Sequence, residues 1–410
     1  MRFNDQEIIL TRLGRQQLAM EQDEIGKAIL CFVENASLDC GMEPLLEQLL
    51  NQYDIPRPLL EADVGRYLQS SLDAGVLAEP SNLKICGLDL SITNQCNATC
   101  VYCPTPRIKV AKRFITLDEV GKLIDDLREP RFEATFGELS TLEVGGLSEP
   151  LLHPRAIDIL REFQRRYPTP YVALYTNGAL LTEETTSAIL AEGLITQLVV
   201  SVDGMDDREH RASKGLDYSL VERNINCFLE TRDRRRSKCC VTLQVLPYAK
   251  YVGLVRMHLG RNPLNVTEVD SGLADRTAEI IQRWQSRVSA CDDVVDATRH
   301  FQLRGEYRSE ADTFAVPEAE LNCPWFDYVA HSINVTSNGD VVMCCNDFEK
   351  EHVLGNYLRS SLYDVAADAR RAFLQNLARN DIEKVPSRCR RKKYCQWLSF
   401  GMGRETRESP

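Results

Sequence analysis

The sequence lacks the features of a secreted or membrane-embedded protein. No stretch approaches the roughly 20 consecutive apolar residues that a membrane-spanning helix needs. The first ten residues, MRFNDQEIIL, contain no apolar core followed by a small-residue cleavage site. Internal repeats and low-complexity tracts are absent as well. These absences predict a cytoplasmic globular protein with no membrane partner.

The chain also lacks an excess of positive charge. The chain has 49 Lys and Arg residues against 60 Asp and Glu residues, which gives a formal net charge of −11. A negatively charged protein is repelled by the phosphates of nucleic acid. The basic runs at 232–238 and 388–393 are local exceptions, but short runs of this kind usually form solvated surface. We therefore expect no nucleic-acid partner.

Cysteine is abundant in an otherwise ordinary composition. A chain of 410 residues is expected to fold into two or three domains, and a hydrophobic content of 43% is typical of globular proteins. Fifteen cysteines are unusual. Because thiols stay reduced in the cytoplasm, this abundance favours metal or redox chemistry over disulfides.

Three regions of the chain differ in their hydrophobic pattern. Residues 1–82 predict a mostly helical, winged-helix-like domain, because apolar residues recur at helical spacing in 43–53 and 59–75 and a short strand follows. Residues 86–290 predict an α/β domain. Residues 291–410 predict a separate cysteine-bearing domain.

The α/β domain contains six short apolar runs separated by helical segments. The runs are GLDLSIT, TLEVGG, YVALYTNG, QLVVSVDG, CVTLQVLP and NVTEVDSG, the last at 265–272. Apolar strands that alternate with helices imply a parallel sheet, and six units favour a partial (β/α)6 TIM barrel over a closed eight-fold barrel. Residues 274–295 predict a helix. Five of the six runs end in polar or glycine residues, and α/β folds carry their chemistry at this carboxyl edge.

Three cysteines lie close together in the loop after the first predicted strand, in the sequence CNATCVYC at 96–103. They are Cys96, Cys100 and Cys103. Three thiolates are soft ligands, which suits an iron–sulfur cubane with one iron left open to bind a small chelating molecule. The alternative is a structural zinc site completed by a distant Cys or His.

This loop resembles the signature of the radical S-adenosylmethionine (SAM) superfamily. GGLSEPLLHP at 145–154, TNG at 176–178 and SVDG at 201–204 resemble further motifs of that family in the same order. The resemblance implies that the three cysteines are catalytic ligands of a [4Fe–4S] cluster, which binds SAM and cleaves it to a 5′-deoxyadenosyl radical. It also implies that Tyr102 contacts the adenine.

The same resemblance implies further contacts with SAM. Glu149 is expected to accept hydrogen bonds from the amino group of SAM. Ser201 and Asp203 are expected to reach the ribose hydroxyls. Lys214, where relatives often have Arg, is expected to pair with the SAM carboxylate, and Asn177 is a second candidate for that pocket.

A second set of cysteines follows residue 320. It resembles the SPASM/twitch extension of many radical SAM enzymes, including a predicted β-hairpin at 331–347. Five cysteines suffice for one auxiliary [4Fe–4S] cluster. The expected ligands are Cys323, Cys344, Cys389 and Cys395. Cys345 competes with Cys344, because neighbouring residues of a strand point to opposite faces. The alternative is a four-cysteine zinc site.

The N-terminal region resembles winged-helix modules that bind the leaders of ribosomally made peptides. The resemblances together imply a radical SAM oxidoreductase that matures such a peptide by crosslinking, epimerisation or oxidation, with flavodoxin or ferredoxin as the electron donor. One alternative is a radical SAM dehydrogenase or epimerase of an aminocyclitol or sugar. A second alternative is a zinc-binding protein without enzymatic activity.

Overall fold

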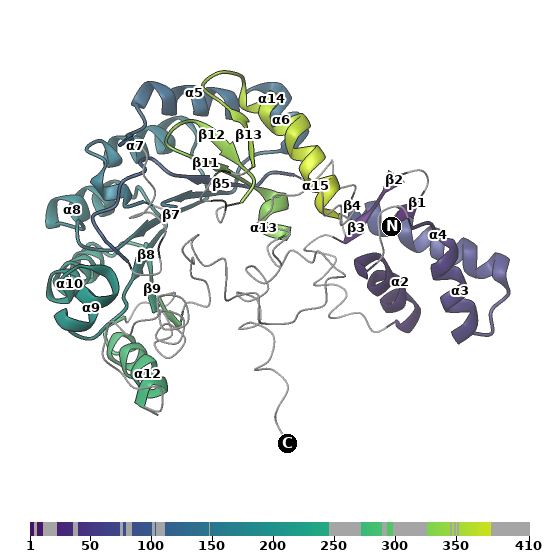
Figure 1. Cartoon of the computed structure of the whole chain (residues 1–410), viewed down its shortest axis with the longest axis horizontal. Helices are drawn as coiled ribbons and strands as arrows, with labels where there is room; N and C mark the ends of the chain where they lie inside the picture. Colours follow the sequence, from purple (N-terminus) through teal and green to yellow (C-terminus); the bar gives the residue numbers. More distant parts are fainter. Residues whose placement is uncertain are drawn as a thin grey trace.

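A computed structural model describes most of the chain. The described residues form two separate hydrophobic cores, and Figure 1 shows the two bodies that contain them, the barrel and the N-terminal helices α2 to α4 (within residues 24–73). The described residues are 1–3, 6–10, 23–35, 40–73, 77–78, 84–100, 103, 111–146, 148–245, 272–288, 293–297, 326–344, 347, 350 and 352–378.

The larger body is built on six neighbouring parallel strands. In sheet order they are β5 (Gly87–Leu90), β6 (Thr141–Val144), β7 (Tyr171–Thr176), β8 (Gln197–Ser201), β9 (Cys240–Val245) and β10 (Val294–Ala297). Because chain order and sheet order agree, each crossover places its helices on one side. The predicted partial (β/α)6 barrel is confirmed.

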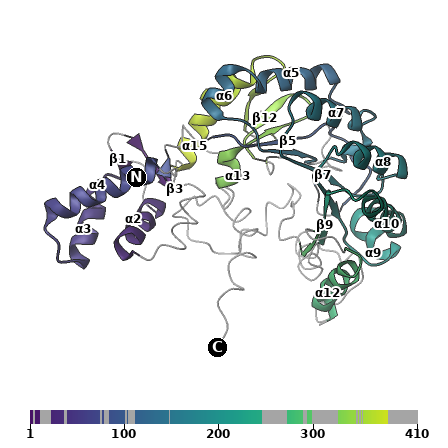
Figure 2. The same ribbon diagram turned by 180° about the vertical axis from the view of Figure 1, so that it is seen from behind.

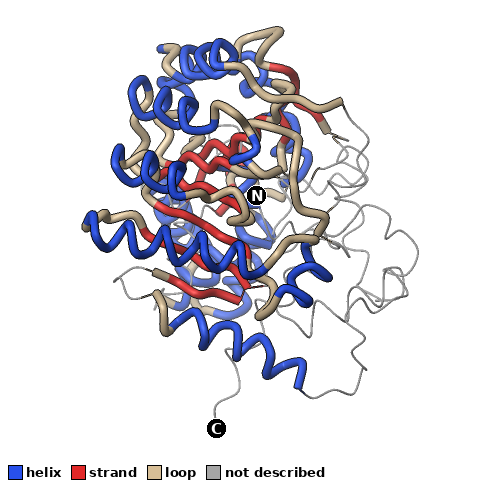
Figure 3. The backbone as a smooth tube through the Cα atoms, turned by 90° about the vertical axis from the view of Figure 1, so that its left-hand side faces the viewer, coloured by secondary structure: helices blue, strands red, loops and turns tan. Residues whose placement is uncertain are grey.

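Helices connect these strands along the outer, convex side of the sheet (Figures 1 and 2). They are α5 (Leu117–Leu127), α6 (Pro130–Phe136), α7 (Ala156–Arg166), α8 (Glu183–Glu192), α9 (Asp207–Lys214), α10 (Tyr218–Arg235) and α12 (Gly272–Gln285). Local sequence fixes their starts. In α5, for example, Thr116 and Glu119 form a reciprocal capping box, and the buried face of the helix follows at Val120, Leu123 and Leu127. Figure 3 shows the strands stacked with the helices along one side.

One predicted helix is shorter than expected. The prediction extended it over 274–295, but α12 ends at Gln285 and the chain forms strand β10 at Val294–Ala297. Parallel pairing with β9 overrides the local pattern, and the β-branched pair at 294–295 suits a strand. The sixth parallel strand is therefore β10, which adds to the barrel from beyond the expected boundary at 290. Residues 265–271 of the strand expected at 265–272 lie outside the described residues, and its last residue, Gly272, begins α12.

A C-terminal hairpin extends the same sheet. Strand β11 (Ser332–Val335) pairs in parallel with β5, and β12 (Asp340–Val342) and β13 (Val353–Asn356) continue the sheet with antiparallel pairing. The predicted hairpin is confirmed, with Gly339 at φ +82° in its turn. Helix α13 (Phe326–His331) precedes this hairpin. The last described elements are α14 (Leu362–Val365), a π-helical turn (Ala366–Arg370) and α15 (Arg371–Ala378).

The smaller body is the N-terminal region. Its helices are α2 (Glu24–Asn35), α3 (Glu43–Gln52) and α4 (Arg57–Asp73), and its short strands are β1 (Arg2–Phe3), β2 (Gln6–Glu7), β3 (Ile9–Leu10) and β4 (Leu77–Ala78). The last two helices and β4 agree with the prediction. Strands β1 to β3 were not predicted, because each has only two residues, too few to show the alternating pattern of a strand. Helix α2 was also missed, although the spacing of Ile25, Ile29 and Val33 carries the signal.

No helix among the described residues is long and apolar enough to span a membrane. This agrees with the scan of the whole sequence for apolar runs.

Candidate active site

The cysteine loop begins at the carboxyl end of β5 and is anchored to the segments that follow three other strands, β6, β7 and β8. The backbone N–H of Thr99 donates to the carbonyl of Lys214 (2.7 Å), and the N–H of Glu149 donates to the carbonyl of Gln95 (2.8 Å). The side-chain amide of Asn177 donates to Asn97 Oδ1 (2.8 Å). The loops after β5, β6, β7 and β8 therefore meet at one edge of the barrel, as the sequence predicted.

Glycine permits the closest of these contacts. Gly215 ends helix α9 in the left-handed conformation, with φ +71°. A Cβ atom at this position would lie 2.2 Å from Thr99 Oγ1. Any larger residue would therefore push the cysteine loop away from α9.

The thiols of this loop interact with one another. Burial raises the pKa of Cys96 to about 11 and that of Cys100 to about 12. The charge of Cys103 also raises the pKa of each of these two thiols, whereas the charge of Lys214 lowers both pKa values. The three sulfurs therefore share one partly buried environment with a nearby cation.

This environment fits an iron–sulfur cluster. Thiolates are the ligands that iron–sulfur clusters take, and the nearby ammonium group of Lys214 offsets part of their negative charge. Among the described residues no three Cys, His, Asp or Glu side chains converge on one point, as the ligands of a single ion would. Cubane ligands need no such convergence, because each cysteine binds a different iron. When bound and reduced, such a cluster supplies the electron that cleaves SAM.

Glu149 is a buried carboxylate that joins two loops. Its Oε1 accepts from the Thr176 hydroxyl (2.8 Å) and the Leu151 N–H (3.1 Å), and its Oε2 accepts from the Asn177 N–H (2.7 Å). Burial raises the pKa of the carboxyl, while these donors oppose the rise. With three donors in place, the two oxygens keep lone pairs for one further donor, such as an ammonium group.

Lys214 points at the residues expected to hold the ribose. Its Nζ donates to the carbonyl of Ser201 (2.9 Å) and lies 3.4 Å from Asp203 Oδ2. Both charged side chains are almost fully buried, with 2% and 6% exposed. Lys214 thus orients the end of β8, and its charge also acts on the thiols of the cysteine loop.

Several expected ligands lie outside the described residues. These are Tyr102, Cys323, Cys345, Cys389 and Cys395. Cys344 is described and lies two residues after the end of strand β12. The carbonyl of the intervening Met343 accepts a hydrogen bond from the buried Asn334 side-chain amide (3.3 Å). The structure thus places one expected auxiliary ligand at the end of the hairpin.

Sequence reasoning missed three contributors to the site: Asn97, Thr176 and Gly215. Thr176 lies within a quoted motif, and Gly215 directly follows Lys214, so both positions carried a signal. Asn97 is one residue from Cys96, and nothing in the sequence indicates its partner. Its bond to Asn177 joins residues 80 positions apart in the chain.

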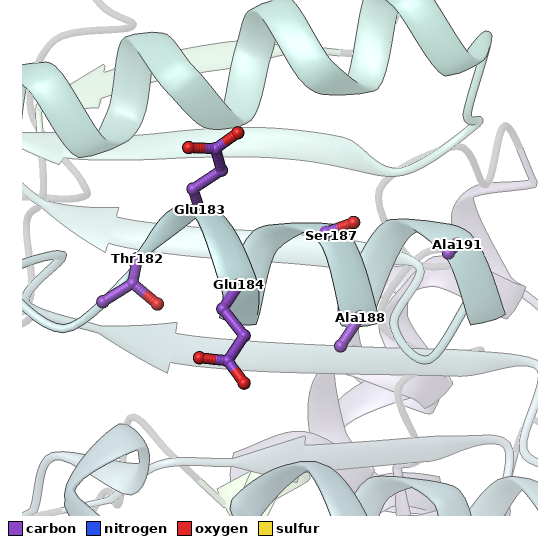
Figure 4. A pocket seen from close by; sticks show the side chains of 6 residues that line it. All are labelled: Thr182, Glu183, Glu184, Ser187, Ala188 and Ala191. Atoms are coloured by element: carbon purple, nitrogen blue, oxygen red, sulfur yellow. The ribbon is translucent and has the colours of Figure 1, made fainter.

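A surface depression elsewhere plays no part in this arrangement. It is lined by side chains of helix α8 and its N-cap, which Figure 4 shows along one helix. These residues are Thr182, Glu183, Glu184, Ser187, Ala188 and Ala191.

A partial barrel with a three-cysteine loop at its carboxyl edge defines an iron–sulfur enzyme of the radical SAM class. Residues 90–248 match the radical SAM superfamily, and residues 323–396 match the iron–sulfur cluster-binding domain called SPASM. The chain is a radical SAM enzyme with a C-terminal SPASM domain. Its cofactors are SAM, a SAM-binding [4Fe–4S] cluster and an auxiliary iron–sulfur cluster.

Curated relatives share part of the chain. The tungsten-containing aldehyde ferredoxin oxidoreductase cofactor-modifying protein of Pyrococcus furiosus is 34% identical over 97 residues, which are 24% of this chain and 25% of that protein. GTP 3′,8-cyclase of Yersinia pestis is 26% identical over 239 residues, 53% of this chain and 70% of that protein. The chain thus spans about a quarter of the first relative.

The comparison with solved structures gives matches at low sequence identity. Streptococcus suis SuiB bound to the precursor peptide SuiA is 14% identical with a TM-score of 0.44, covering 85% of this chain and 82% of that chain.

Proposed function

We propose that this radical SAM enzyme matures a ribosomally synthesised peptide by abstracting a hydrogen atom from one of its residues. The product would be a crosslinked, epimerised or oxidised peptide. The observation that carries the proposal is the N-terminal body, which has its own core of three helices and short strands and is separate from the core of the barrel. A substrate small enough to enter the barrel needs no such additional body.

The N-terminal body offers the geometry for binding an extended peptide. Among the described residues, strands β3 and β4 form a two-stranded sheet, paired at Ile9 with Ala78 and at Leu10 with Leu77. A two-stranded sheet presents backbone N–H and C=O groups at its edges, to which a peptide can add as a further strand. Leu59 at the start of α4 is 60% exposed and supplies an apolar contact on the same body.

For the barrel we propose the roles that the sequence suggested. Cys96, Cys100 and Cys103 would hold the cluster, and Glu149 would accept from the amino group of SAM. The Asp203 and Ser201 side chains would bind the ribose. The remaining assignments follow in the same way: Tyr102 on the adenine, Lys214 or Asn177 near the SAM carboxylate, and Cys323, Cys344, Cys389 and Cys395 on the auxiliary cluster.

The electron donor, the cellular compartment and the role of the auxiliary cluster are part of the same proposal. A flavodoxin or ferredoxin would supply the electron, and the reducing cytoplasm would keep the cluster ligands as thiols. The auxiliary cluster would either accept an electron from the substrate radical or help to hold the substrate.

The test is binding and turnover of a candidate precursor peptide, such as one encoded beside this gene. Full-length protein should bind the leader, and a chain lacking residues 1–82 should lose both leader binding and peptide modification. SAM affinity of the shortened chain serves as the control for an intact barrel. Unchanged peptide turnover by the shortened chain would contradict the role of the N-terminal body.

The match to GTP 3′,8-cyclase over 53% of the chain favours one competing function, a nucleotide-modifying reaction. Anaerobic turnover with GTP and SAM tests it. Conversion of GTP, with no change in any peptide, would replace the peptide proposal. Turnover of an aminocyclitol or sugar by the chain lacking residues 1–82 would also replace the peptide proposal.

A further inference from the structure

The strands of the barrel have two chemically different faces. Alternate residues such as Leu88, Leu90, Leu142 and Val144 pack into the core beneath the helices and are at most 1% exposed. The residues between them point to the opposite, inner side, because successive side chains of a strand alternate. This inner side borders the edge at which the cysteine loop lies.

Most inner positions are polar and partly accessible, although Gly87, Ala173, Val199 and Asn334 are buried. On β5 to β9 and β11 they are Gly87, Asp89, Thr141, Glu143, Tyr171, Ala173, Tyr175, Gln197, Val199, Ser201, Cys240, Thr242, Gln244, Ser332 and Asn334. These positions include two carboxylates, on the paired residues Asp89 and Glu143, and no Lys or Arg. The described inner strand face is therefore negatively charged.

Glu143 is held in place by the neighbouring strand. The Tyr175 hydroxyl on β7 donates a hydrogen bond to its carboxylate. Burial raises the pKa of the Glu143 carboxyl, and the hydrogen bond from Tyr175 partly offsets that rise. Loss of water around this carboxylate leaves it more sensitive to an approaching positive charge.

The Glu143–Tyr175 pair lies next to the SAM-binding loops. A Cβ atom added to Gly145 would be 2.7 Å from Tyr175 Cβ, so Tyr175 packs directly under the glycine-rich loop that leads to Glu149. Tyr175 also directly precedes Thr176, whose hydroxyl binds Glu149 (2.8 Å). A substrate group bound to this pair would therefore lie beside the SAM pocket.

We propose that Glu143, oriented by Tyr175, selects a positively charged group of the substrate. This inference rests on the proposed peptide function. It implies that the modified residue of the peptide is a lysine or an arginine, or a direct neighbour of one. An ammonium or guanidinium group makes a charge-assisted hydrogen bond with the carboxylate. At the described inner positions of the strands, the triphosphate of a nucleotide would meet two carboxylates and no Lys or Arg.

The test measures binding of three synthetic peptides to anaerobically reconstituted, SAM-loaded holoenzyme. The peptides are blocked at both ends, seven residues long and identical except for a central Lys, Gln or Glu among alanines. The Lys peptide should bind about tenfold more tightly than the Gln peptide, as expected for a charge-assisted hydrogen bond, and the Glu peptide most weakly. The wild-type comparison needs no variant and alone can overturn the proposal.

Variants assign the preference to the residue. Glu143→Gln retains an acceptor for Tyr175 but removes the charge, so the preference for Lys over Gln should fall to about twofold or less. The matched control is Glu184→Gln on the exposed face of α8, which should keep the full preference. A full preference in Glu143→Gln would overturn the assignment. Iron content and melting temperature identify a variant that fails to fold, in which case the wild-type comparison decides.

A parallel arm separates this inference from the peptide function. Binding of n-butylamine and butyrate to the same holoenzyme compares the two charges without a peptide. A preference for the amine that disappears in Glu143→Gln supports the inference even if leader binding fails. Leader binding with equal affinity for the three heptapeptides would overturn the inference and leave the peptide function standing.

Discussion

Replacing Gly215 by alanine should damage the cysteine loop, whereas the same change at Gly193 should not. Both glycines end a helix in the left-handed conformation, at φ +71° and +61°. A Cβ atom at Gly193 would meet nothing within 4 Å, but one at Gly215 would lie 2.2 Å from Thr99 Oγ1 and 3.4 Å from Thr99 Cβ. The two variants therefore share a backbone cost and differ in one contact.

The magnitude of each effect follows from the usual costs of left-handed backbone and of overpacking. An alanine in the left-handed region costs about 1–2 kcal/mol, which both variants should lose. Overpacking at Gly215 should cost about 1–3 kcal/mol more. At about 2–4 °C for each kcal/mol, Gly215→Ala should melt several degrees below Gly193→Ala.

The assay compares melting temperature, iron content and SAM affinity of the two anaerobically reconstituted variants. Gly215→Ala should lower iron content and SAM affinity, and Gly193→Ala should leave both as in the wild type. Adding Thr99→Ala should partly rescue Gly215→Ala, because the overlapping hydroxyl is removed and the Cβ atoms then stand in ordinary contact. Equal behaviour of the two single variants would refute the docking of the cysteine loop on α9.

Three further changes test other parts of the account. Lys214→Met leaves Asp203 buried without its cation, so the free energy of unfolding should fall by about 3–5 kcal/mol and calorimetry should show weaker SAM binding; unchanged affinity would exclude an orienting role. Arg232→Met breaks the buried pair with Asp293 (2.6 Å) at the start of β10, so denaturant unfolding should show a similar loss with SAM affinity intact. Cys323→Ala should remove about four irons per chain and block product while SAM cleavage stays measurable, and a wild-type iron content would rule it out as a ligand.

The elements that the sequence predicted correctly are those with local signals. The first five strands of the barrel are apolar runs, and the first four of them end in polar or glycine residues. The hairpin at β11 and β12 has alternation and a turn of the SNGD type. The cysteine loop was found because its three thiols lie within eight positions.

The elements that the sequence did not predict depend on partners far away in the chain. Strand β10 is defined by its pairing with β9, which lies about 50 residues earlier. The contacts of Lys214 with the Ser201 carbonyl and with Asp203 were not predicted, since they require the actual path of the backbone. The negative inner face appears only when Asp89 and Glu143 are placed on adjacent strands.

The most direct test of the central claim is the mass of a precursor peptide, encoded beside this gene, after anaerobic turnover with SAM and a reductant. The account predicts loss of two hydrogen atoms, or uptake of deuterium from heavy water for an epimerisation, together with 5′-deoxyadenosine and only with residues 1–82 present. A peptide of unchanged mass, with GTP or a small molecule converted instead, would contradict it.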